Sequence, residues 1–116
     1  MLGATTRKLN RDTGERKALF RDLVSALILH GRIETTVAKA KETKKIADVL
    51  VSLAIRGDMH ARRQARRLLT DPKVVRRLFT DVAPKHERGR GGYTRLIRTR
   101  TRRGDASEMA IVEFVS

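Results

Sequence analysis

The spacing of apolar residues between positions 19 and 28 constrains the fold of this chain more than any other feature. These residues recur three and four positions apart, which predicts an amphipathic helix from Thr13 to about His30. Gly31 follows at the position where a left-handed residue commonly ends a helix. The side chains expected on the buried face of this helix are Leu19, Phe20, Leu23, Val24, Leu27 and Ile28.

Glycine, aspartate and proline mark the bounds of three further helices. A second helix is expected from about Val37 to Arg56, where a glycine stops it. Asp58 can cap a third, shorter helix, and Asp71 followed by a proline is a strong start for a fourth helix, which stops at Pro84. The residues expected to be buried are Ile46, Val49, Leu50 and Leu53 in the second helix, and Val74, Val75, Leu78, Phe79 and Val82 in the fourth.

Three segments have the pattern of strands: Arg32–Thr36, Tyr93–Thr101 and Met109–Val115. The last two are separated by turn residues and predict a hairpin, to which the first strand is joined. The expected fold is therefore α+β, in the order α-β-α-α-α-β-β, with a three-stranded sheet and helices packed on one face. We expect a single small domain over residues 13–116, preceded by a basic N-terminal arm over residues 1–12.

The bulk composition limits the classes of protein to which the chain can belong. A length of 116 residues suits one domain, and the absence of Trp means that Leu, Ile, Val and Ala must build the core. There is no Cys, so disulfides and thiolate metal sites are excluded. The beginning of the sequence lacks the apolar segment of a secretory signal, and no apolar run is long enough to span a bilayer. We expect a cytoplasmic protein.

The charge balance points to a polyanionic partner. The chain has 27 Lys and Arg against 13 Asp and Glu, a formal net charge of +14. Arginine supplies most of the positive charge, and its planar guanidinium can bind phosphate oxygens in a fork and stack on bases. These properties favour a nucleic acid over a membrane surface.

The residues needed for enzyme chemistry are scattered. His30, His60 and His86 lie in three separate segments, and no pair of them has the spacing of a metal-binding motif. The glycine-rich "GRGG" lacks the Lys-Ser/Thr that completes a phosphate-binding loop of nucleotide hydrolases. We expect no catalytic residues, metal, cofactor or small-molecule substrate, and nothing in the sequence requires a homo-oligomer.

The expected hairpin carries the densest group of arginines. Arginine recurs at alternate positions 98, 100 and 102, which predicts that these side chains share one face, opposite Ile97, Thr99 and Thr101. A charged edge strand can simply block aggregation, but this number of arginines exceeds that need and favours phosphate contact. Tyr93 is equally compatible with stacking on a base and with a place in the core. The RNA-binding residues predicted in this region are Arg88, Arg90, Tyr93, Arg95, Arg98, Arg100 and Arg102.

The third helix contains the sequence "ARRQARR", which predicts a basic face with the alanines turned inward. No acidic residue occurs between Asp58 and Asp71, whereas an ordinary surface helix intersperses acids. The alternative function is a DNA-binding regulator that places this helix in the major groove, although Gln64 alone suits base reading. A membrane-surface protein would need aromatic anchors, and the lack of Trp argues against it. The candidate phosphate-binding residues here are Arg62, Arg63, Arg66 and Arg67.

The segment "RKLNRDTGERKALFRDLVSALILHGRIETTVAKAKE" closely resembles the opening of the bacterial ribosomal large-subunit protein seventeen family. The motifs "KLNR", "RKAL", "HGRIETT" and "KAKE" match that family in order and spacing. The similarity continues through "LAIRGDMHARR", "VVRRLF", "APKHERGRGGYTR" and "VEF", and therefore covers almost the whole chain. Departures include "MLGATT" at the start, Glu15 where relatives often have His, and Asp22 where they have Asn.

The resemblance implies a structural protein of the large ribosomal subunit that binds ribosomal RNA near the nascent-chain exit. It implies large-subunit ribosomal RNA and neighbouring ribosomal proteins as partners, and no catalytic activity. It also implies RNA contacts at the positions that match the family's motifs, including Arg88, Arg90, Arg95 and Arg98 around the glycine-rich loop. In the arm, the first helix and the second helix these positions are Lys8, Asn10, Arg11, Arg16, Lys17, Arg21, Lys39 and Lys41. Arg7, also in the arm, is a further predicted RNA-binding residue.

Overall fold

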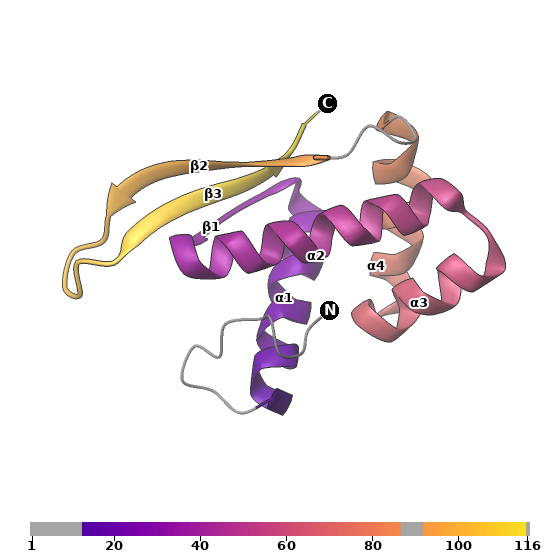
Figure 1. Ribbon diagram of the computed structural model, residues 1–116, viewed down its shortest axis with the longest axis horizontal. Helices are drawn as coiled ribbons and strands as arrows, with labels where there is room; N and C mark the ends of the chain where they lie inside the picture. Colours follow the sequence, from indigo (N-terminus) through magenta and orange to yellow (C-terminus); the bar gives the residue numbers. More distant parts are fainter. Residues whose placement is uncertain (1–12, 87–91, 116) are drawn as a thin grey trace.

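The structure is a computed structural model that describes residues 13–86 and 92–115. In this part of the chain four α-helices and a three-stranded antiparallel sheet form a small α+β domain, as predicted. Figure 1 shows the sheet on one side of α2, with α1, α3 and α4 below and beside that helix. The elements follow one another as α1 (Thr13–His30), β1 (Arg32–Thr36), α2 (Val37–Arg56), α3 (Met59–Leu69), α4 (Pro72–Arg77), β2 (Thr94–Thr101) and β3 (Glu108–Phe114).

The helix ends lie where their capping residues predict. Gly31 and Gly57 adopt left-handed φ angles of +84° and +69° just past α1 and α2. The Asp58 carboxylate accepts a hydrogen bond of 2.7 Å from the Ala61 N–H and caps α3. Asp71 caps α4 by accepting a bond of 2.9 Å from the Lys73 N–H. Two glycines and two aspartates in the sequence therefore mark these four helix boundaries.

The segment after α4 departs from the predicted single helix. Residues Leu78–Val82 form a π-helical turn (η1), in which the Ala83 N–H donates to the Leu78 carbonyl, five positions earlier. A short 3₁₀ turn, Ala83–Lys85 (η2), then ends the helical segment. The expected α-helix to Pro84 was therefore wrong in its second half, because the backbone there changes to wider and then narrower turns.

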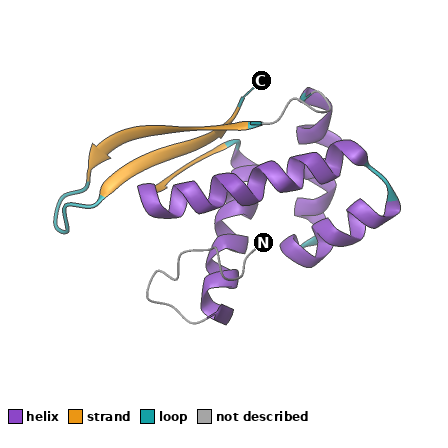
Figure 2. Cartoon of the chain, viewed as in Figure 1, coloured by secondary structure: helices purple, strands orange, loops and turns teal. Residues whose placement is uncertain are grey.

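The sheet has the strand order β1-β3-β2, so β3 is the central strand, between its hairpin partner β2 and the third strand β1. Ile33 lies opposite Val112 and Ile97 lies opposite Ile111. The helices cover one face of this sheet, and Figure 2 shows strands and helices in separate layers. The turn between β2 and β3 projects beyond the N-terminal end of α2 (Figure 1).

The core consists of two clusters that share Phe114. The larger cluster joins the four helices around residues such as Phe20 and Leu50, and the smaller one lies between the sheet and α2. Alanines at positions 40 and 47 form much of the α2 surface in the smaller cluster. Val49, predicted to be buried, is 37% exposed, because the buried face of α2 is centred on these alanines instead.

One carboxylate holds the start of β2 against the central helix. The Asp48 Oδ1 accepts hydrogen bonds from the Tyr93 N–H (3.1 Å), the Thr94 N–H (3.1 Å) and the Thr94 hydroxyl (2.9 Å). Its other oxygen accepts a bond of 3.0 Å from Lys44 Nζ. Hydrogen bonds to a charged group are among the stronger ones in proteins, so Asp48 fixes the hairpin relative to α2.

No helix in the described ranges is long and apolar enough to cross a membrane.

The core position of Leu50 gives a direct test of this packing. We expect Leu50→Ala to lower the free energy of unfolding by about 2–5 kcal/mol, because the side chain is fully buried and its removal leaves a cavity. Val49→Ala, at the neighbouring exposed position, should change it by only about 0.5 kcal/mol. Urea unfolding followed by circular dichroism measures both, and equal losses would contradict the assignment of the buried face.

Candidate nucleic-acid interface

The hairpin arginines that the sequence singles out are paired with carboxylates of the same chain. Two of these pairs link β2 to β3: Arg95 Nε lies 2.7 Å from Glu113 Oε1, and Arg98 Nη1 lies 3.0 Å from Glu108 Oε2. Both arginines are exposed, so each pair is worth little in stability and leaves donors of the guanidinium free for other acceptors. The pairs nevertheless cancel much of the positive charge that the sequence places on this hairpin.

A bulge in β2 disrupts the expected alternation of its side chains. Arg98 lies opposite Ala110, but three residues later Thr101 lies opposite Glu108, only two residues away on β3. The extra residue in β2 shifts the pattern of faces along the rest of the strand. A regular alternation of arginines along one face therefore does not continue past Arg98.

The contacts of Glu34 show the effect of this bulge. The Thr99 hydroxyl donates to Glu34 Oε2 at 2.8 Å, and Arg100 Nη2 donates to Glu34 Oε1 at 3.3 Å. Regular alternation would place these neighbours on opposite faces, yet both reach the same carboxylate on β1. The prediction that Arg98, Arg100 and Arg102 share one face, opposite Thr99, was therefore wrong.

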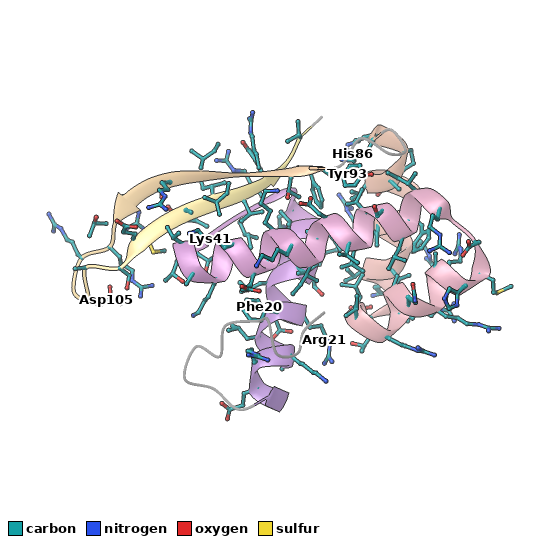
Figure 3. All side chains as sticks on the ribbon, in the orientation of Figure 1. Phe20, Arg21, Lys41, His86, Tyr93 and Asp105 are labelled. Atoms are coloured by element: carbon teal, nitrogen blue, oxygen red, sulfur yellow. The ribbon has the colours of Figure 1, made fainter. Side chains whose placement is uncertain are left out.

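Two carboxylates of the sheet and its turn are held in the ionised form. The Thr99 hydroxyl and then the Arg100 guanidinium lower the pKa of Glu34 below its ordinary value. Hydrogen bonds from Arg102 and from the Ser107 N–H lower the pKa of Asp105 strongly. Arg102 follows the end of β2 and is bound to Asp105, which Figure 3 shows at the tip of the hairpin.

The basic face predicted for the third helix is present on α3. Ala61, Ala65 and Leu69 are buried, and the alanines therefore face inward as expected. The four arginines are exposed, and among the described residues none of them has a carboxylate within ion-pair distance. This uncompensated group consists of Arg62, Arg63, Arg66 and Arg67.

One flank of α3 meets α1 at a cationic cleft. The cleft has a volume of about 300 Å³ and is lined by Lys17 and Arg21 of α1 and by Arg67 of α3, above buried apolar side chains of α1 and α2. Arg21 Nε lies 3.4 Å from the Leu68 carbonyl and so spans from one helix to the other. Figure 3 shows Arg21 on α1, on the side of the molecule where α3 lies. The packing of α1 against α3 thus brings together cations that are far apart in the sequence.

The other flank of α3 meets α4 and η1 at a second groove of about 230 Å³. Arg62 and Arg66 line this groove together with Arg76 and Phe79. Neither of the last two was predicted to take part in binding: Phe79 was assigned to the core, and Arg76 was not singled out. A sequence signal that could have found Arg76 is its position in "VVRRLF", directly after two valines that are buried. Because the valines occupy the buried side of this short helix, Arg76 lies on the exposed side.

The remaining predicted residues of the described ranges are divided between surface and interior. Lys41 lies at the exposed start of α2 and lines a shallow hollow with Arg98 and Glu108, while Lys39 is half-buried nearby. Arg16 is only 6% exposed, so it adds little to the surface of α1. The residues Arg7, Lys8, Asn10, Arg11, Arg88 and Arg90 lie outside the described residues.

Tyr93 lies in the core. Its side chain is 3% exposed, and its ring packs edge-on against His86 with centroids 5.5 Å apart (Figure 3). A ring in this position has no open face on which a base could stack. Of the two interpretations that the sequence left open for Tyr93, the structure supports the core residue.

The described residues contain no cluster of His, Asp or Glu that could hold a metal ion. The candidate site is therefore a surface of arginine and lysine side chains on α1, α3 and α4. It has the chemistry to bind a chain of phosphates.

Comparison with known proteins identifies the family. The family described as ribosomal protein L17 matches residues 19–115. The chain belongs to this family. The large ribosomal subunit protein bL17 of Clostridioides difficile is 52% identical over 112 residues, which cover 97% of this chain and 99% of that protein. The proteins of the same name from Clostridium botulinum (strain Hall) and Clostridium acetobutylicum are each 50% identical over 109 residues, covering 94% of this chain and 96% of theirs.

Membership in the L17 family confirms the resemblance seen in the sequence. The chain is a ribosomal protein, a structural class, and is not an enzyme. This also weakens the alternative of a DNA-binding regulator, although α3 is as basic as that alternative required.

The lowered pKa of Glu34 predicts a pH-dependent contribution to stability. Because its pKa is lower in the folded state, the contribution is complete above the unfolded-state pKa and is lost as pH falls through the folded-state pKa. We expect Glu34→Gln to lower the melting temperature at neutral pH, with the difference shrinking toward zero in acid. Thermal unfolding at a series of pH values measures this. A difference that stays constant into acid would show that the carboxylate charge is not what matters.

Proposed function

We propose that this chain is a structural constituent of the large ribosomal subunit that binds and stabilises folded ribosomal RNA through arginine and lysine contacts to phosphate. The relatives at about 50% identity are named as large-subunit proteins. The observation that carries the RNA contact is a group of cations that have no carboxylate within ion-pair distance among the described residues: Lys17 and Arg21 of α1, the four arginines of α3, and Arg76 of α4. Such groups repel one another unless an anion lies against them.

The geometry of these cations suits a folded polyanion. The arginines of α3 form a ridge between two grooves, one shared with α1 and the other with α4. Phosphates can therefore bind along both flanks of α3, and Arg can contact two oxygens of one phosphate at once. Arg95, Arg98, Arg100 and Arg102 of the hairpin make further phosphate contacts, at a lower gain because each of these four has a carboxylate neighbour.

We further propose that the predicted arm over residues 1–12 and the basic residues Arg88 and Arg90 extend the contact along the RNA. Neighbouring ribosomal proteins and a location near the nascent-chain exit belong to the same proposal. Their support is the similarity of the sequence to a large-subunit relative, which extends over 97% of this chain.

Two double variants of equal charge change test where the RNA binds. Arg66→Gln with Arg67→Gln removes two uncompensated charges of α3, whereas Arg98→Gln with Arg100→Gln removes two arginines that are paired with carboxylates. We expect the first pair to reduce affinity for a fragment of large-subunit ribosomal RNA more. It should lower the slope of log K against log salt concentration by about one for each phosphate that the variant no longer binds.

The same titrations contain the outcomes that would contradict the proposal. Equal reductions for both pairs would show that only net charge matters, and a larger reduction for the hairpin pair would place the RNA on the sheet. Affinity that hardly depends on salt would defeat phosphate binding altogether. Tighter binding to duplex DNA than to the RNA fragment at equal salt would favour the DNA-binding alternative.

A further inference from the structure

The groove between α3 and η1 contains an aromatic ring as well as cations. The guanidinium carbon of Arg62 lies 4.6 Å from the centroid of the Phe79 ring. Arg66 and Arg76 line the same groove, and its lining includes no carboxylate among the described residues. The nearby carboxylate of Asp81 does not line the groove. Its Oδ2 lies 3.9 Å from Arg77 Nη1, and its Oδ1 accepts a hydrogen bond of 3.2 Å from the Thr80 hydroxyl. The groove thus offers positive charge next to a planar, partly apolar surface.

Phe79 holds one face of the Arg62 guanidinium and leaves the other face available. The ring is half-buried and packs against the larger core cluster, so it is a firm support. Arg62 itself is exposed, and the contact with the ring restricts its otherwise flexible side chain. A guanidinium that is already held in place loses less entropy when a second flat group stacks on it.

We propose that this groove binds one unpaired nucleotide of the RNA, with its base stacked on the Arg62 guanidinium and its phosphates bound by Arg66 and Arg76. The inference rests on the proposed RNA-binding function and specifies the ligand of one part of that surface. A volume of about 230 Å³ is below the range of drug-sized ligand pockets, so it suits a single small group and not a duplex.

The nucleotide must be unpaired because a base inside an RNA helix has both faces covered by its neighbours. Bases in loops and bulges are unstacked and can lie on arginine planes or aromatic rings. The groove has little with which to read base identity, since its one hydroxyl, that of Thr80, already donates to the Arg76 carbonyl at 2.8 Å. Binding should therefore distinguish unpaired from paired nucleotides and tolerate any base, because every base has a π face.

A conservative substitution at two nearby arginines gives a matched test. Arg62→Lys keeps the charge but removes the planar group that stacks. Arg77→Lys makes the same chemical change at an exposed arginine that pairs with Asp81 and does not line the groove. The two RNA probes are a two-stranded duplex with one bulged nucleotide and the same duplex fully paired, so that no loop offers a second unpaired base. The quantity measured is the ratio of the two dissociation constants for each protein.

We expect the unsubstituted protein and Arg77→Lys to prefer the bulged RNA by about tenfold, the scale of one base stacked on a side chain. Arg62→Lys should lose most of this preference, and Phe79→Leu should lose part of it, because Leu fills the core but does not support the guanidinium. If 2-aminopurine is the bulged base, its fluorescence should change on binding to the unsubstituted protein and much less with Arg62→Lys. The chain has no Trp to interfere with that signal.

Equal preferences for Arg62→Lys and Arg77→Lys would overturn the site, as would an unsubstituted protein that binds both RNAs equally. In either case salt-dependent binding of both probes would leave the proposed RNA-binding function standing. Failure of the unsubstituted protein to bind either probe at modest salt would instead overturn both the site and the function on which it rests. Circular dichroism melts of each variant verify that the fold is retained.

Discussion

The small number of carboxylates, and their positions in the fold, are the constraint on which the rest of this structure depends. The chain has 13 Asp and Glu against 27 Lys and Arg, so most cations cannot be neutralised within the molecule. The fold places its carboxylates where they hold elements together: Asp48 binds β2 to α2, and Asp58 and Asp71 cap helices. Four others are paired with arginines of the hairpin, namely Glu34, Asp105, Glu108 and Glu113. Among the described residues the four arginines of α3 have no carboxylate partner, and Lys17, Arg21 and Arg76 lie beside them, although unpaired cations also occur at the sheet, at Arg32 and Arg103.

Much of the fold could be predicted from the sequence because local signals agree with the packing. Gly31 and Gly57 end helices and Asp71 starts one, and the alternating segments pair as a hairpin with a third strand. The π turn at η1 could not be predicted, because its backbone is set by packing rather than by a local motif. The exposure of Val49 was not predicted for a related reason. Alanines carry little weight in an apolar pattern, yet Ala40 and Ala47 face the sheet and define the buried side of α2, which leaves Val49 exposed.

The candidate site was harder to predict, since sequence shows the position of a charge along the chain and not its partner in space. The alternating arginines looked like one cationic face, but a single bulge separates Arg98 from Arg100, and carboxylates distant in sequence neutralise both. The basic face of α3 was predictable because all its members lie on one helix. Its two grooves were not, because Arg76 and Lys17 come from other helices that packing brings alongside.

The account claims that arginines without carboxylate partners, and not the arginine-dense hairpin, form the main contact with RNA. The most direct test is phenylglyoxal modification of each arginine, read by mass spectrometry for the free protein and for its complex with folded large-subunit ribosomal RNA. The account predicts strong protection of Arg66 and Arg67 on α3 and of Arg21 on α1, with weaker protection at Arg95 and Arg98. Protection confined to the hairpin, with the α3 arginines as reactive in the complex as in the free protein, would contradict it.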